Sequence, residues 1–138
     1  MRLGIYDPAE HTLIVGTRKI SGFAEGTMIE FVPNNAKLMS AKVGARGEYS
    51  ILKNRNRSGM INVNLDPESE SNIYLNSLVG AESIFPVYIQ RNGETVRDIL
   101  TAPEGWIEER PDFSADDTGP TRTWGIGAGS VQQIPQAV

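Results

Sequence analysis

The sequence Gly59-Met-Ile-Asn-Val-Asn-Leu-Asp66 alternates strictly between apolar and polar residues from its third position onward, and two of the polar residues are asparagines. Ile61, Val63 and Leu65 therefore point to one side of an extended chain, and the two asparagines point to the other. A period of two is typical of a β-strand with one face on a core and one face on solvent or a partner. An amide-bearing face is suited to contact with another surface rather than to chemistry.

Further strands are expected on both sides of this stretch, because short runs of β-forming residues alternate with turn residues. We predict strands over residues 12–20, 27–32, 48–54, 59–66, 84–90, 94–100, 106–110 and 121–128. The Arg91-Asn-Gly93 sequence between two of these runs predicts a β-hairpin.

One segment, residues 68–79, has helical character. Ser69 or Ser71 is a candidate N-cap, and Gly80 is a natural stop. Ile73, Tyr74, Leu75 and Leu78 are spaced as an apolar helical stripe. The predicted fold is therefore mainly β, an antiparallel sandwich or barrel of seven or eight strands with one short flanking α-helix.

Composition agrees with a single β domain over residues 1–138, since a chain of 138 residues can bury a sizeable core without cross-links. The absence of cysteine excludes a disulfide framework and thiolate metal sites. The first residues lack the apolar run of a signal peptide, and no stretch reaches the length of a membrane span. We expect a soluble protein made in the cytoplasm, with no membrane partner.

Charge is distributed unevenly along the chain. Residues 1–65 carry nine Lys or Arg against five Asp or Glu, whereas residues 66–138 carry four against twelve, so the halves are +4 and −8 within a net charge of −4. Halves of opposite sign suit head-to-tail self-association. The alternative is that the two halves interleave in the fold and the charges mix.

Apparent catalytic and metal motifs do not hold up. Ser50-Ile-Leu-Lys53 matches the S-x-x-K pattern, but the partner motifs of serine acyl-enzymes are missing. In a calcium loop starting at Asp66, the required glycine and glutamate positions are occupied by Ser71 and Ser77. Other carboxylates that could bind a cation are Glu108, Glu109, Asp112, Asp116 and Asp117, for which a solvated acidic face is the default reading. We predict no enzyme activity, no cofactor and no metal site.

Several stretches resemble a known family: Ile20-Ser-Gly-Phe-Ala-Glu-Gly-Thr27, Val43-Gly-Ala-Arg-Gly-Glu48 and Asn54-Arg-Asn-Arg-Ser-Gly59, followed by Trp106 and Arg122-Thr-Trp124. From about Thr12 to Gly129 the chain resembles the tail tube proteins of contractile-tailed bacteriophages. The resemblance implies a β-barrel or sandwich with a flanking helix, which assembles as hexameric rings that stack into a tube inside a contractile sheath. The tube proteins of type VI secretion and of phage-tail-like bacteriocins share this architecture, so a related injection device is the near alternative.

The resemblance also implies partners and a location. The partners are other copies of the chain and the tail sheath, tape-measure and baseplate proteins, in a virion tail that is assembled in the host cytoplasm. DNA would pass through the bore without specific binding. Because phosphate contacts by Lys and Arg strengthen binding, an amide or acidic lining suits such a bore, and Asn62, Asn64 and Asp66 are the candidate lumen-facing residues.

Residues 33–47 form a long predicted connection, and connections of this length are uncommon in compact domains unless they are functional. In tube proteins the corresponding loop reaches the adjacent ring. The resemblance therefore implies a ring-stacking loop in which apolar residues pack on a neighbouring subunit while basic residues meet its acidic surface. The residues are Lys37, Leu38, Met39, Lys42, Val43 and Arg46. The alternative is that the apolar residues complete the subunit's own core.

Two rival classes remain open. A nucleic-acid-binding β-barrel would use Lys53, Arg55 and Arg57 together with aromatic stacking platforms, against which stand the net charge of −4 and an aromatic content of only 7%. An enzyme of unknown type would need a cleft with perturbed acids or bases, and the sequence nominates none.

Overall fold

The computed structural model describes residues 11–24, 26, 28–80, 83–93, 95–113 and 120–137, which form ten strands and one helix. The strands are β1 (His11–Val15), β2 (Arg18–Ile20), β3 (Ile29–Pro33), β4 (Met39–Val43), β5 (Tyr49–Lys53), β6 (Gly59–Leu65), β7 (Phe85–Asn92), β8 (Val96–Glu109), β9 (Arg122–Gly129) and β10 (Gln132–Ala137), and the helix is α1 (Ser71–Gly80). Every strand pairing is antiparallel. The predicted mainly β, antiparallel fold with one short helix is confirmed.

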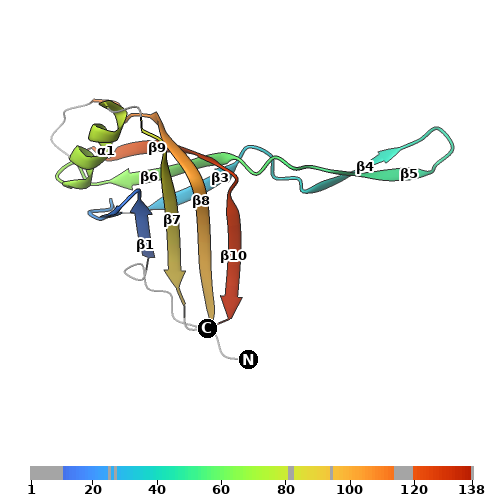
Figure 1. Ribbon diagram of the computed structural model, residues 1–138, viewed down its shortest axis with the longest axis horizontal. Coiled ribbons are helices and arrows are strands. Elements are labelled where there is room, and N and C mark those ends of the chain that lie inside the picture. The colour runs from blue at the N-terminus through green and yellow to red at the C-terminus, as the bar shows by residue number, and fades with distance from the viewer. Residues whose placement is uncertain are drawn as a thin grey trace.

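Eight strands make one sheet in the order β2-β1-β7-β8-β9-β6-β3, with β10 also paired to β8. Strand β8 is the corner of this sheet. One edge of β8 pairs with β7, while its other edge pairs first with β10, at Thr101↔Gln132, and then with β9, at Glu104↔Gly129. Bulges lie between Phe85 and Val87 and between Ile107 and Glu109, and bulges bend strands. The sheet thus folds into two layers, with β1, β7, β8 and β10 running across β3, β6 and β9 (Figure 1).

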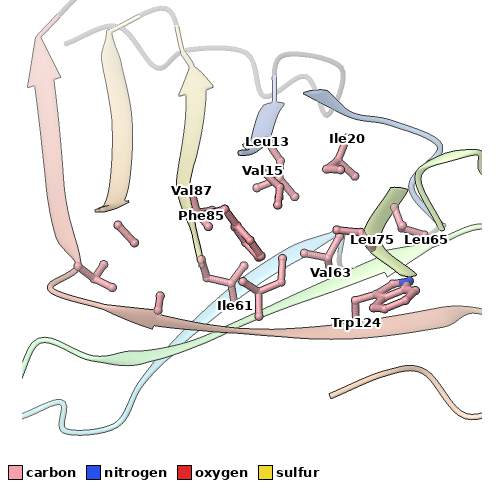
Figure 2. Close-up of a cluster of buried hydrophobic side chains, with 14 residues drawn as sticks. Leu13, Val15, Ile20, Ile61, Val63, Leu65, Leu75, Phe85, Val87 and Trp124 are labelled. Atoms are coloured by element: carbon pink, nitrogen blue, oxygen red, sulfur yellow. The ribbon is translucent and has the colours of Figure 1, made fainter. Parts of the chain in front are cut away.

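The hydrophobic core lies between the two layers (Figure 2). The alternation predicted for β6 is confirmed, because Ile61, Val63 and Leu65 are each 0% exposed. Side chains from β1 and β7 approach these residues from the other layer. The buried set is Leu13, Val15, Ile20, Ile61, Val63, Leu65, Leu75, Phe85, Val87, Ala102, Trp124, Ile126, Ala128 and Val131.

Helix α1 is bound to both layers. The Tyr74 hydroxyl donates to the Val15 carbonyl at 2.8 Å, and the Trp124 indole Nε1 donates to Asn72 Oδ1 at 2.8 Å. The Ser69 hydroxyl accepts the backbone N–H of Ser71 at 3.2 Å, as an N-cap does. The described helix is not long and apolar enough to span a membrane. One part of the predicted stripe is wrong: Leu75 is buried, but Ile73 is 74% exposed.

Several strand boundaries differ from the sequence prediction. Residues 12–20 form two strands rather than one, because Gly16 adopts a φ of 64° and starts a tight turn that pairs Val15 with Arg18. Residues 106–110 belong to the end of β8, which continues through the bulge. The hairpin at Arg91-Asn-Gly93 is confirmed by the pairing of Asn92 with Arg97.

Two strands were not predicted from the sequence. β4 lies within the connection that was expected to be a loop, and it pairs with β5 along Met39–Val43. β10 follows β9 after Ser130, whose φ of 52° redirects the chain towards the first half of β8. The main sheet has eight strands, in agreement with the seven or eight predicted, and the separate β4–β5 hairpin brings the total among the described residues to ten.

Candidate functional site

The most distinctive feature is an arm, residues 34–58, that projects from the two-layered body and contains the β4–β5 hairpin (Figure 1). β4 and β5 pair only with each other and form a separate two-stranded sheet. The hairpin closes at Gly44–Gly47, where the Gly44 N–H donates to the Glu48 carbonyl at 2.7 Å and Gly47 has a φ of 88°. A left-handed φ of this kind favours glycine.

The stem of the arm is held by asparagine and serine. The Asn34 N–H donates to the Ser58 carbonyl at 3.0 Å, and the Asn34 side-chain amide donates to the Ser58 hydroxyl at 2.9 Å. Further along, the Asn54 side-chain amide donates to the Lys37 carbonyl at 3.0 Å. The Val131 N–H donates to the Arg57 carbonyl at 2.8 Å and attaches the stem to the start of β10. The polar run before β6 therefore fixes where the arm leaves the body.

The hairpin has two unlike faces. The cross-strand pairs Val43↔Tyr49, Ala41↔Ile51 and Met39↔Lys53 share one face, which is apolar apart from the lysine. The other face carries Ser40, Lys42, Ser50 and Leu52. We call the first set, Met39, Ala41, Val43, Tyr49 and Ile51, the apolar face of the arm. An isolated two-stranded hairpin is marginally stable in water, so this arrangement is suited to being covered by a partner.

The residues predicted to form a ring-stacking loop all lie on the arm. Leu38, Met39 and Val43 are 59%, 63% and 70% exposed, so they do not complete the core of their own chain. Lys37, Lys42 and Arg46 are exposed beside them. Their contact with a neighbouring ring stays a prediction. The sequence reasoning missed Tyr49 and Ile51, at 69% and 64% exposed, although the alternation in Tyr49–Lys53 was a usable signal.

Charge is concentrated on the arm. Residues 34–58 contain six Lys or Arg and one Glu, a formal charge of +5, and because the whole chain carries −4, the remainder carries −9. The basic surplus is therefore concentrated on the arm, and the acidic surplus belongs to the rest of the chain. The basic residues of the arm are Lys37, Lys42, Arg46, Lys53, Arg55 and Arg57.

A second candidate surface is the face of β3, β6 and β9 that points away from the core. Asn62 pairs with Glu30 and with Gly125, and Asn64 pairs with Thr123, whose hydroxyl donates to Asn64 Oδ1 at 2.7 Å. The outward positions of these strands contain no lysine or arginine: they are Glu30, Val32, Met60, Asn62, Asn64, Thr123, Gly125, Gly127 and Gly129. We call this set the polar sheet face.

Asp66 follows β6 and organises the turn before α1. Its carboxylate accepts the Glu68 N–H at 2.9 Å, and its carbonyl accepts the Asn72 side-chain amide at 3.0 Å. The structure therefore brings Asn62 and Asn64 together on one face and places Asp66 at the end of it. A lumen-facing role for all three stays a prediction.

The glycines near the end of β9 make room for other side chains. A Cβ at Gly127 would collide with the Trp106 indole, and a Cβ at Gly125 would lie 3.1 Å from Glu109 Cβ and from Met60 Sδ. The glycine-rich segment thus lets side chains of β6 and β8 lie flat on the polar sheet face, as expected for glycine at a site of close approach.

No reaction centre stands out among the described residues. One hollow, of about 680 Å³, lies between the stem of the arm, β3 and β10, and Arg57 is the one ionisable side chain in its lining. Among the described residues no group of three or more His, Cys, Asp or Glu could hold a metal ion. Asp116 and Asp117, two of the carboxylates considered from sequence, lie outside the described residues.

No family model matches this sequence, and no curated protein sequence matches it either. Solved structures do match. The fold is that of proteins from contractile injection systems. It is similar to a structure described as the sheath/tube terminator of an extracellular contractile injection system, PVC, in the extended state, with a TM-score of 0.64 and 13% identity over 96% of this chain and 97% of that one.

Two further structures share the fold. One is described as the tube terminating cap of the anti-feeding prophage, with a TM-score of 0.61 and 11% identity over 100% of this chain and 97% of the other. The other comes from the PVC sheath-tube complex in the extended state, with a TM-score of 0.62 and 12% identity over 96% and 91%. At these identities the similarity establishes the fold, and it extends over nearly the whole of each chain.

Proposed function

We propose that this chain is a structural subunit of the tube of a contractile tail or a related injection device. In this proposal residues 1–138 are one tail-tube-like domain, six copies form a ring, and rings stack into a conduit for genome delivery. The role is non-enzymatic. The partners are other copies, the sheath, the tape-measure protein and the baseplate, in a virion tail assembled in the host cytoplasm.

The observation that carries the proposal is the arm. Its apolar face is exposed in the single chain, and its charge of +5 opposes the −9 of the remainder. A second copy supplies both an apolar surface and the opposite charge, so a heterologous contact between copies satisfies both features. The shared fold with components of injection systems supports the same assembly.

The matched structures also favour a second role, because two of them are described as a tube terminator and a tube terminating cap. A terminator closes a tube, whereas a tube subunit repeats along it. Negative-stain electron microscopy of the purified protein separates the two. Long hollow tubes support the tube subunit, single rings that do not stack support the terminator, and a protein that stays monomeric at every concentration and salt contradicts both.

The first prediction concerns the apolar face of the arm. Met39→Asp combined with Val43→Asp places two charges on a surface that we expect to be buried between copies. The double variant should keep its β circular dichroism and a cooperative melt but form no tubes or stacked rings. Ser40→Asp with Ser50→Asp, on the opposite face of the hairpin, is the matched control and should retain more assembly. Normal polymerisation of the Met39/Val43 variant would contradict the stacking role.

A bore lined by the polar sheet face follows from the same proposal. Asn62, Asn64 and Glu30 present amides and a carboxylate without a neighbouring lysine or arginine on that face. Such a lining does not hold passing DNA, because affinity for phosphate depends on cationic contacts. The rival reading, a nucleic-acid-binding barrel, would instead use the basic arm, and its test is given in the Discussion.

A further inference from the structure

The arm and α1 lie at opposite ends of the long axis of the molecule (Figure 1). β6 connects the two ends, since it begins at Gly59, beside the stem of the arm, and ends at Leu65, before the turn into α1. The segment after β8 returns to the same end, where Arg110, Pro111 and Phe113 line a hollow with Asn72 and Asn76 of the helix. We call this surface, formed by residues 66–76 and 108–113, the α1 end.

The α1 end is acidic. It carries six carboxylates and one arginine, with Arg122 adjacent to it on β9, so the local balance is negative where that of the arm is positive. The carboxylates are Asp66, Glu68, Glu70, Glu108, Glu109 and Asp112. Glu68 and Glu70 are exposed on the turn that leads into the helix.

The α1 end also exposes large apolar side chains. Ile73 is 74% exposed on α1, and Phe113 is 88% exposed, with its ring centroid 5.5 Å from the Arg122 guanidinium. An isoleucine on a helix usually faces the core, and the apolar stripe predicted from the sequence included Ile73. These exposed apolar side chains among carboxylates are the counterpart of the apolar face of the arm, where Lys53 lies on the same face and Arg46 lies in the closing turn of the hairpin.

We propose that the arm of one copy docks on the α1 end of the next copy. The apolar face of the arm covers Ile73 and Phe113, and Arg46 and Lys53 of the hairpin lie against Glu68, Glu70 and Asp112. Two independent properties, apolar area and charge, match at the same pair of surfaces, as at interfaces with an apolar centre and a charged rim. This inference rests on the proposed self-assembly and adds the partner surface. Because the two surfaces lie at opposite ends of one molecule, the contact repeats as an open stack.

The test uses charge reversal at each end of the full-length protein. Variant A, Glu68→Lys with Glu70→Lys, changes the charge of the α1 end from −5 to −1, and variant B, Arg46→Glu with Lys53→Glu, changes that of the arm from +5 to +1. Each variant alone should need a concentration at least about tenfold higher than the wild type to assemble, measured by sedimentation. Mixed at equal concentration, A and B should assemble better than either does alone, because the unchanged arm of A meets the unchanged α1 end of B, and the reversed residues of each variant meet those of the other. Circular dichroism confirms that each variant is folded.

Glu104→Lys is the matched control for Glu68→Lys alone, since it makes the same substitution on β8 outside the α1 end. It should change assembly less than Glu68→Lys does. If variant A assembles as well as the wild type while the Met39/Val43 variant does not, the arm docks elsewhere and the proposed function stands. Failure of the mixture to assemble better than either variant alone also overturns the docking site. If the wild type itself never assembles, the proposed function fails first.

Discussion

At the scale of single residues, Trp124 joins the helix to the body. Its side chain is 3% exposed and its indole nitrogen donates to Asn72 at 2.8 Å. Trp124→Phe removes the donor, leaves the Asn72 oxygen without it and opens a small cavity, so the free energy of unfolding should fall by about 1–3 kcal/mol. Urea denaturation in the Met39/Val43 variant, which we expect to remain unassembled, measures the change. Trp106→Phe is the control; Trp106 is 37% exposed, and an equal loss there would contradict the role of Trp124.

Single residues also show what can be predicted from sequence. The inward positions of β6 follow from the period of two alone, because a strand buried on one face must place every second side chain inside. Ile73 was placed wrongly for a physical reason. A helix of ten residues at the end of a sheet needs only a narrow contact, which Tyr74, Leu75 and Leu78 supply. The spacing of apolar residues along a helix does not show which of them contact the core and which stay exposed.

At the scale of elements, the stem decides how the arm is held. Asn54→Ala removes the side-chain bond to the Lys37 carbonyl, so amide hydrogens of the β4–β5 hairpin should exchange faster, while those of β6 and β9 keep their protection. The free energy of unfolding should fall by less than about 0.5 kcal/mol, because no buried side chain is involved. Ser40→Ala, on the exposed face of β4, is the control. A parallel loss of protection in β6 would mean that arm and body unfold as one unit.

The unpredicted strands lack the signals that sequence reading depends on. β4 does not contact the core, and all of its residues are exposed, so they do not alternate between buried and exposed positions. β10 is also exposed throughout and contains Pro135, which argues against a strand unless it lies at an edge. Both segments form strands because each has a pairing partner. β4 pairs with β5, and β10 pairs with the first half of β8. Pairing partners distant in sequence are what a single sequence does not reveal.

At the scale of the whole molecule, the surplus of negative charge outside the arm predicts poor binding to nucleic acid. Free protein should bind duplex DNA with a Kd of about 10 µM or weaker at physiological salt, and assembled protein should bind more weakly still, since its basic arms are covered. Fluorescence anisotropy with a labelled duplex measures both. Arg55→Ala with Arg57→Ala should remove most of the residual binding. A tight complex with a steep salt dependence would favour the nucleic-acid-binding rival.

The sequence already indicated the separation of charge, since its two halves differ in sign, but not how far the separation goes in space. The boundary of the basic region is the stem of the arm, where Asn34 and Ser58 pair, and this boundary depends on a tertiary contact. The α1 end also depends on a tertiary contact, because residues 66–76 and 108–113 are distant in the sequence and come together only in the folded chain. The composition of each segment determines the sign of its net charge, and the topology of the fold determines where that charge lies in space.

Strand β8 gives the molecule a mechanical property. A single backbone of fourteen residues runs through both layers and is flanked by β7 on one edge and by β10 and then β9 on the other. Tension along this strand would load the flanking hydrogen bonds in shear, all at once, rather than unzip them in turn. We expect a chain built in this way to resist stretching along β8 more than peeling at the short edge strand β2.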